Sequence, residues 1–257
     1  MAVVNLPNKS KANQYTAASV DTLIGGSSTD TVVVTGTVTG ASVDLVAGND
    51  KLTLSNGNNS ATISNVETVV DGTGSSTITI GAAAPRGSID MGAGNDALTL
   101  GNFTNTLTVA NTETVTGGTG TDTITLVGAL TTSHAIDLGA GKDKLTLGSA
   151  INTGTVSNIE TLVSGTGADT ITLGTQMTNG SVDLGAGADK LTFSSAGTNS
   201  ATVANVETII GGAANNTIVL AKSITGGSID LGAGVDKLTL GSFTNTVTVA
   251  NTETVAG

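Results

Sequence analysis

Aspartates inside glycine-rich turns are the residues of this sequence whose type and spacing could do chemistry. The phrase Gly-Ala-Gly-x-Asp-Lys-Leu-Thr-Leu and its close variants recur along the whole chain. Carboxylate and backbone carbonyl oxygens are the ligands of Ca²⁺, which takes about six to eight of them. Gly allows the backbone to curl until several carbonyls face one point. These turns therefore predict calcium binding, and the alternative is that Asp and Gly form turns without any metal.

The predicted calcium site combines one Asp carboxylate per turn with the glycines that let turn carbonyls face the ion. The carboxylates belong to Asp30, Asp50, Asp96, Asp122, Asp143, Asp169, Asp189 and Asp236. The turn glycines are Gly118, Gly120, Gly139, Gly141, Gly165 and Gly167. Two turns carry Ser76 and Asn216 where Asp is expected and are not predicted sites. A further set either binds metal or opens an exposed turn: Asp44, Asp90, Asp137, Asp183 and Asp230.

Other polar residues recur with the same period. The glutamates are expected to form structural corners and not to bind metal: Glu67, Glu113, Glu160, Glu207 and Glu253. The asparagines that precede them are expected to form a hydrogen-bonded ladder of stacked amides: Asn65, Asn111, Asn158, Asn205 and Asn251. Asp21 begins the same acidic column as Asp44, so that of the 20 acids only Asp71 lies outside the columns. Stacked like charges repel, so the columns favour bound cations.

An internal repeat must position these residues. The Asp phrase and the Asn-x-Glu-Thr phrase each recur five times, every 46 or 47 residues. Within each repeat, acids recur every 23 or 24 residues. Repeated units that cannot bury their apolar faces alone stack into solenoids. We interpret each half-repeat as one coil, which gives about ten coils of about 23 residues. A single 47-residue coil per repeat is the alternative.

The segments between the turns are predicted to be β-strands. Residues 122–126 and 143–147 alternate apolar with polar side chains, which is the period of a strand. Ile124, Leu126, Leu145 and Leu147 are expected to point inward. The predicted fold is therefore all-β, a parallel β-solenoid of the β-roll or β-helix type. Residues 20–257 form this repeat domain, and residues 1–19 form an arm that either clasps a neighbouring subunit or is disordered.

Composition excludes several classes of function. The net charge of −11 argues against nucleic acid and anionic membranes as partners. The chain has no Cys, one Arg, one Tyr and one His, so a nucleophile, base and orienting group cannot be assembled. His134 lies in a variable turn and is expected to be exposed. We therefore expect no enzymatic activity.

The turns resemble a known family. Residues 117–125, GGTGTDTIT, match the nonapeptide G-G-x-G-x-D-x-U-x, in which U is a large apolar residue, and residues 164–172 match it except at the first position. The sequence is similar to the RTX, or hemolysin-type calcium-binding, repeat family over about residues 20–257, and resembles repeat regions of RTX surface-layer proteins. This resemblance implies a parallel β-roll with several Ca²⁺ ions between turns. It also implies secretion by a type I route.

The ends of the repeat region predict assembly. The C-terminal residues 251–257 stop one phrase short of a new turn, and residues 21–30 supply that phrase. Head-to-tail stacking of copies would continue the register and propagate as a fibre. No stretch resembles a cleaved N-terminal signal or a membrane-spanning helix. The predicted function is a secreted, calcium-binding structural protein that forms an extracellular or cell-surface filament, layer or biofilm matrix, with itself as partner.

Two alternatives remain open. Outward rows such as Thr123 and Thr125, or Thr170 and Thr172, fit an adhesin or a module that binds ice or cell-surface polysaccharide. Outward Thr is also common on ordinary sheets. The chain could also be an engineered or excised repeat fragment.

Overall fold

Two compact units of parallel β-structure make up the chain. The computed structural model describes residues 3–6 and 13–257. Val127 ends the first unit, and Gly128 begins the second. In each unit, odd-numbered strands form one sheet and even-numbered strands form another, with neighbours in strictly alternating order. No helix long and apolar enough to span a membrane occurs in the described part of the chain.

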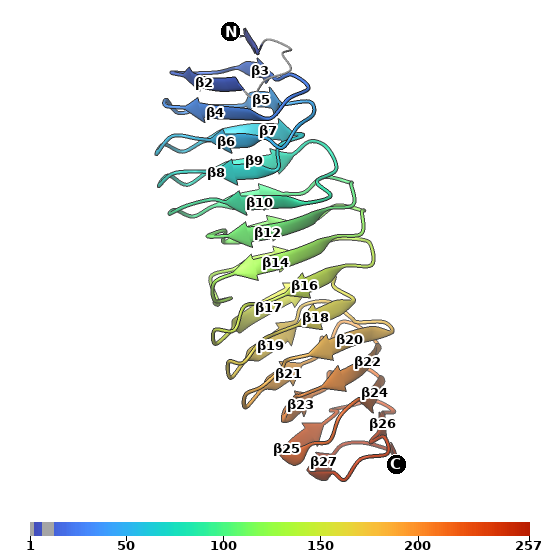
Figure 1. Cartoon of the computed structure of the whole chain (residues 1–257). Helices are drawn as coiled ribbons and strands as arrows, with labels where there is room; N and C mark the ends of the chain where they lie inside the picture. Colours follow the sequence, from blue (N-terminus) through green and yellow to red (C-terminus); the bar gives the residue numbers. More distant parts are fainter. Residues whose placement is uncertain (1–2, 7–12) are drawn as a thin grey trace. The chain divides into compact units, whose positions relative to one another are not determined.

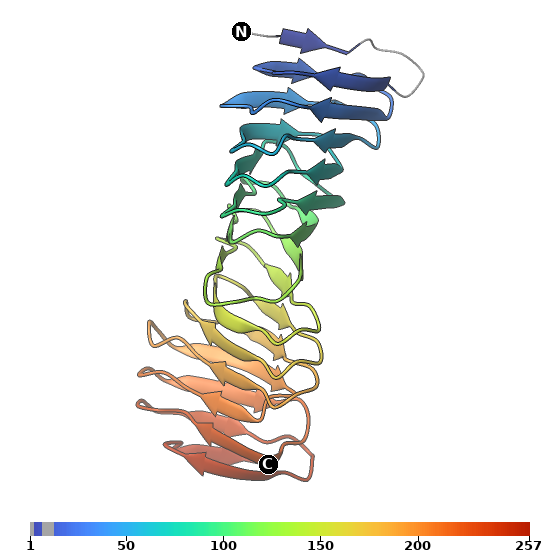
Figure 2. The ribbon, with the colours of Figure 1, turned by 90° about the vertical axis from the view of Figure 1, so that its left-hand side faces the viewer.

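The described residues of the first unit form fourteen strands. Its odd-numbered strands are β1 (Val3–Asn5), β3 (Thr22–Ile24), β5 (Ala41–Asp44), β7 (Ser60–Ser64), β9 (Thr77–Ile80), β11 (Ala97–Thr99) and β13 (Thr114–Thr116). Its even-numbered strands are β2 (Asn13–Ala17), β4 (Asp30–Val34), β6 (Lys51–Thr53), β8 (Thr68–Val70), β10 (Gly87–Asp90), β12 (Thr106–Ala110) and β14 (Thr123–Val127). Each coil contributes one strand to each sheet, as the stacked arrows of this unit show (Figures 1 and 2).

The second unit repeats this arrangement. Its odd-numbered strands are β15 (Ala135–Asp137), β17 (Thr153–Ser157), β19 (Thr170–Leu173), β21 (Lys190–Thr192), β23 (Thr208–Ile210), β25 (Thr225–Asp230) and β27 (Thr246–Ala250). Its even-numbered strands are β16 (Lys144–Thr146), β18 (Thr161–Val163), β20 (Gly180–Asp183), β22 (Asn199–Ala204), β24 (Asn216–Leu220), β26 (Lys237–Thr239) and β28 (Thr254–Ala256). The predicted all-β parallel solenoid is confirmed.

The core is a stack of aliphatic side chains between the two sheets. Inward and outward residues alternate along each strand, as the pleat of a strand requires. Ile124, Leu126, Leu145 and Leu147, which the alternation predicts to be inward, are all buried. The intervening Thr and Lys side chains of β14 and β16 lie on the outer faces, and none of them is buried.

The length of a coil differs from the prediction. Residues paired on successive coils are 17 positions apart for Lys51 and Thr68, and 20 apart for Thr31 and Lys51. A coil is therefore shorter than the predicted 23 residues, and the strands make more than the predicted ten coils. A single 47-residue coil is excluded as well. Each repeat contains five strands, because Asp143, Asp189 and Asp236 directly precede β16, β21 and β26. Half a repeat is thus two and a half strands, which is not a coil.

The solenoid begins before residue 20. Val3–Asn5 pair with β3, and Asn13–Ala17 pair with β4, in the same parallel register as later strands. The described parts of the predicted arm are therefore the first strands of the two sheets. The predicted clasp or disorder at residues 7–12 lies outside the described residues.

Candidate functional site

The turn aspartates that were predicted to bind calcium are buried inside the solenoid. Asp30, Asp122, Asp143 and Asp169 have no exposed surface, and the other four are 1% exposed. Each lies immediately before, or at the first residue of, a strand. Burying a carboxylate is costly unless it is hydrogen-bonded or paired with a cation, so the partners of these groups decide what they do.

Hydrogen bonds connect these side chains into ladders that run from coil to coil. The backbone N–H of Asp169 donates to Oδ1 of Asp189 at 2.7 Å, and the N–H of Asp189 donates to Oε2 of Glu207 at 2.8 Å. One coil earlier, the N–H of Asn152 donates to Oδ1 of Asp169 at 2.8 Å. Four side chains on four successive coils thus form one ladder, and we number its rungs one to four from Asn to Glu.

The same ladder recurs in each unit with small changes. In the first unit, one ladder comprises Asn59, Ser76, Asp96 and Glu113. Another contains Asp30, Asp50 and Glu67 as rungs two to four. In the second unit, Asn216, Asp236 and Glu253 are rungs two to four of a ladder whose first rung is Asn199. Because a repeat contains five strands, successive ladders of a unit alternate between its two sheets. The ladders of a unit therefore lie along two edges of the fold, one beside each sheet.

Four third-rung aspartates each have one buried oxygen without a hydrogen bond. Oδ1 accepts the N–H from the preceding coil, whereas Oδ2 of Asp50, Asp96, Asp189 and Asp236 is buried and has no hydrogen-bond partner. Burial raises the pKa of Asp50 and of Asp189 to about 6, with further contributions from neighbouring acids. Burial likewise raises the pKa of Asp96. A negative charge on any of these Oδ2 atoms would have no hydrogen-bond donor to stabilise it in the interior.

First-rung asparagines are functional residues that the sequence analysis missed. The Nδ2 group of Asn105 donates to the carbonyl of Phe103 at 2.9 Å and to Oδ1 of Asp122 at 2.9 Å. Asn152 bonds Ala150 and Asp169 in the same way. A sequence signal existed, because the residues recur with the period of the Asp phrase: Asn59, Asn105, Asn152, Asn199 and Asn245.

The turn glycines allow neighbouring turns to approach closely. A Cβ on Gly118, Gly120, Gly165 or Gly167 would collide with backbone of the turn on the preceding coil. Gly139 has a φ of +80°, which favours glycine, and Gly141 lies exposed in the bend before Asp143. Four of the six glycines are thus required for stacking of the turns, whether or not their carbonyls also bind an ion.

The second set of aspartates caps turns at the sheet margin. Oδ1 of Asp183 accepts the N–H of Gly185 at 3.1 Å and the Nδ2 of Asn205, on the next coil, at 2.6 Å. Asp44, Asp90, Asp137 and Asp230 make equivalent bonds. The predicted amide-to-amide ladder is wrong, because each of these asparagines bonds an Asp on the previous coil. The glutamates make a structural contact, because Oε2 of each accepts the N–H of a third-rung aspartate, and their lack of a metal role stays a prediction.

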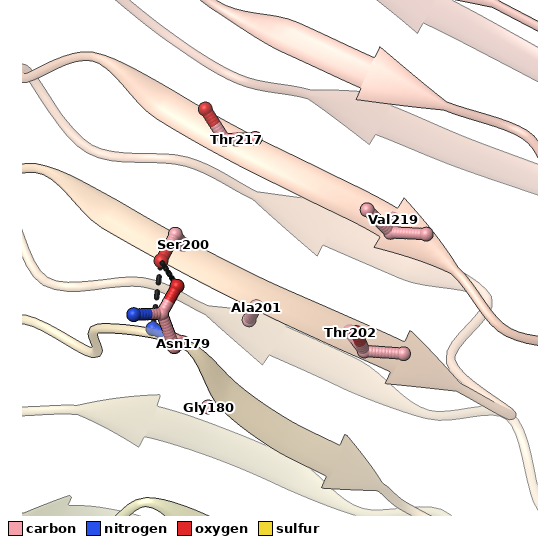
Figure 3. A pocket seen from close by; sticks show the side chains of 7 residues that line it. All are labelled: Asn179, Gly180, Ser200, Ala201, Thr202, Thr217 and Val219. Carbon is pink, nitrogen blue, oxygen red and sulfur yellow. Dashed lines mark hydrogen bonds between the residues drawn. The ribbon is translucent and has the colours of Figure 1, made fainter.

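No other group in the described residues forms a reactive cluster. His134 lies in a turn, where Nδ1 accepts the N–H of Thr131 at 3.1 Å. The hollow shown in Figure 3 measures about 220 Å³ and lies over β20, β22 and β24. Asn179 and Ser200 hydrogen-bond at its side, and its lining contains no titratable side chain.

The ladder residues fit calcium in the kind of donor they offer. The donors are oxygen atoms only, they carry negative charge, and the third-rung Oδ2 atoms are buried and unpartnered, which suits a hard cation. Among the described residues, no group of three or more His, Cys, Asp or Glu side chains could hold a metal ion. Turn carbonyls would therefore have to supply most of the about six to eight ligands.

No family model, curated protein or solved structure matches this chain.

Proposed function

We propose that this protein is a structural solenoid whose stacked coils are stabilised by calcium at the buried carboxylate ladders. The observation that supports the proposal is the unpartnered, buried Oδ2 of Asp50, Asp96, Asp189 and Asp236. An internal oxygen that carries charge and lacks a donor is costly. A bound cation would neutralise it.

Second- and third-rung carboxylates would hold the ion. In the ladders that contain Asp30 with Asp50 and Asp169 with Asp189, two acids lie on adjacent coils, and each raises the pKa of its third-rung neighbour in addition to the effect of burial. Bound calcium would supply neutralisation and cross-link adjacent coils. The chain's own residues provide the charge, the buried oxygens and, through the Glu rung, the alignment of the Asp backbone. We do not extend the site to the margin aspartates, whose Oδ1 atoms already cap turns.

Calcium binding is tested by isothermal titration of metal-free protein with CaCl₂, together with thermal unfolding in calcium and in chelator. We expect several ions per chain and a higher unfolding midpoint in calcium. Asp189→Asn should remove one ion and reduce the calcium-dependent stabilisation. Asp183→Asn is the matched control, because the same chemical change falls on a turn-capping margin carboxylate. No heat of binding and no shift of midpoint in wild type would overturn the proposal.

We further propose that the protein is secreted and assembles end to end into a filament or surface layer. Support comes from the strictly parallel pairing of successive coils, because a second copy of the chain could continue the same register. Edge strands present open N–H and C=O groups to another chain. Extracellular calcium-binding modules have dissociation constants for Ca²⁺ of about 10⁻⁴–10⁻³ M.

Negative-stain electron microscopy in millimolar CaCl₂ tests the assembly. Fibres that dissolve in excess chelator are the expected result. Short, monodisperse particles under both conditions would overturn end-to-end assembly while leaving the calcium proposal intact.

A surface-binding module is the second candidate, and one row of hydroxyls favours it. Thr22, Ser42, Thr62, Thr79, Thr99 and Thr116 occupy the same register on six successive strands of the odd-numbered sheet of the first unit, and none is buried. Regular hydroxyls at about 4.8 Å intervals would suit ice or a polysaccharide. Thermal hysteresis or glycan binding that is lost in Thr62→Lys/Thr79→Lys would support this candidate. If monomeric wild type shows neither thermal hysteresis nor glycan binding, this candidate is excluded.

A further inference from the structure

We propose that Asp71 supplies the missing carboxylate of the ladder that carries Ser76, so that a divalent-cation site of hard oxygen ligands exists at Asp71 and Asp96. This inference rests on the proposed calcium function and extends it to a turn whose sequence departs from the Asp pattern. Residues 71–76 read DGTGSS, whereas the equivalent residues 117–122 and 164–169 read GGTGTD and SGTGAD. The acid has moved from the last residue of the turn to the first.

The first and last residues of this turn reach the same place in the structure. In the ladder that begins with Asn152, the hydroxyl of Ser164 donates to Oδ2 of Asp169. Ser164 is the first residue of its turn and Asp169 is the last. The Nδ2 group of Asn152 bonds Oδ1 of Asp169 at 3.0 Å. In the first unit, Nδ2 of Asn59 bonds Oδ1 of Asp71 at 2.7 Å. The same first-rung amide therefore contacts a carboxylate in both ladders, although the carboxylates come from different backbone positions.

Ser76 preserves the backbone part of the ladder. Its Oγ accepts the N–H of Asn59 at 3.0 Å, and its own N–H donates to Oδ1 of Asp96 at 2.7 Å. The work of one second-rung aspartate is thus divided between two residues. Ser76 connects the coils, and Asp71 contributes the charge.

The divided ladder is well equipped for a cation. Asp71 and Asp96 are 7% and 1% exposed, and each has an Oδ2 that is buried and without a hydrogen-bond partner. The pair thus offers two unpartnered oxygens, whereas both oxygens of Asp169 are hydrogen-bonded. Burial raises the pKa of Asp96, and the charges of Glu113 and Asp71 add to the rise.

If Asp71 served only to accept the hydrogen bond of Asn59, an uncharged acceptor would be sufficient at this position. In the ladder that carries Asn216, its amide Oδ1 accepts Nδ2 of Asn199 at 2.8 Å, so the hydrogen bond needs no charge. Retention of a second negative charge next to Asp96, despite the cost of burying it, points to an ion. The Asn216 ladder has one aspartate, Asp236, with one unpartnered oxygen, and is expected to bind calcium more weakly.

The test counts calcium ions by equilibrium dialysis with CaCl₂. Asp71→Asn should bind one ion fewer than wild type. The relocation variant Asp71→Gly/Ser76→Asp should bind the wild-type number, because it recreates the sequence of the other turns. Asn216→Asp should gain one tight site. An unchanged count in Asp71→Asn, or a relocation variant that stays one ion short, would overturn the site.

A metal-free measurement separates this inference from the proposed function. Urea unfolding in chelator is compared for Asp71→Gly, Ser76→Asp and the relocation variant. Ser76→Asp alone places two carboxylates in one spot and should be strongly destabilised, and removing Asp71 should relieve that loss. If the two substitutions have additive effects on the free energy of unfolding, Asp71 does not replace residue 76, whether or not calcium binds. If wild type binds no calcium, the cation site and the proposed function both fail.

Discussion

A third-rung carboxylate has two oxygens in different situations, one hydrogen-bonded and one buried without a partner. Asp50 shows this clearly, because Oδ1 accepts the N–H of Asp30 at 2.6 Å, whereas Oδ2 has no hydrogen bond. The first oxygen aligns adjacent coils. The second carries charge into the interior, and without a cation it works against folding.

Asp50→Asn is therefore expected to leave metal-free protein at pH 8 as stable as wild type or to raise its unfolding midpoint by a few degrees. The amide oxygen keeps the bond to Asp30, and the buried charge disappears. Thermal unfolding followed by circular dichroism is the measurement. Asp90→Asn, at a half-buried turn cap, is the control and should change little. A marked fall in the midpoint of Asp50→Asn would mean that the charge stabilises the fold without calcium.

Glu207 has a different task, because its Oε2 accepts the N–H of Asp189 at 2.8 Å. Glu207→Ala leaves that N–H without its acceptor and is expected to cost about 1–3 kcal/mol of unfolding free energy. Glu207→Gln retains an oxygen acceptor and should recover most of the loss. Urea unfolding at fixed calcium measures both. Equal losses in the two variants would assign the effect to the charge of the glutamate instead of to its hydrogen bond.

At the scale of the strand and turn, close stacking depends on particular glycines. Gly185, with a φ of +85°, lies so near the turn below that an added Cβ would collide with the carbonyl oxygen of Gly165. Gly226 has a φ of +73° but has open space around its Cα. Substitutions at Gly226 would test backbone strain alone, whereas substitutions at Gly185 would add a steric conflict between coils.

Gly226→Ala is expected to cost about 1–2 kcal/mol, the usual penalty of a left-handed conformation for a residue with a Cβ. Gly185→Ala should cost clearly more, because the turns must also move apart. Chemical denaturation of both variants gives the comparison. Similar losses would show that the turns can separate without disturbing the ladders.

Sequence patterning predicted the strands well and the coil poorly. Alternation correctly identified four inward residues, because successive side chains of a strand point to opposite faces. These residues are Ile124, Leu126, Leu145 and Leu147. The acid spacing of 23 residues did not give the coil, because Asp44 caps a turn at the sheet margin, whereas Glu67 ends a ladder. Acids with different structural roles therefore recur at one spacing in the sequence and look like a single column. The inward orientation of the turn aspartates depends on pairing between coils, which local sequence does not encode.

At the scale of the whole molecule, buried acids make stability depend on pH. Burial raises the pKa values of Asp50 and Asp189 to about 6 in the folded protein. The unfolded chain binds fewer protons than the folded protein between about pH 4 and 6, so the free energy of unfolding falls as pH rises through that window.

Metal-free protein should therefore unfold at a midpoint several degrees higher at pH 5 than at pH 7.5. In calcium the difference should shrink, because protons compete with the ion for the same carboxylates. Scanning calorimetry at the two pH values, with and without CaCl₂, measures this. A variant that combines Asp50→Asn with Asp189→Asn should show a weaker pH dependence. A metal-free midpoint that rises toward pH 7.5 would contradict the assignment of these acids.

The odd number of strands in a repeat has a genetic consequence. In the second unit, the aspartates before β16, β21 and β26 fall on even, odd and even strands in turn. Repetitive coding sequences gain and lose whole repeats through unequal recombination. A gain of one repeat would turn every later surface residue to the opposite side of the solenoid, and a gain of two would restore its side. An odd change in repeat number would thus exchange the surfaces that later repeats present on a given side. An even change would alter only the length of the solenoid.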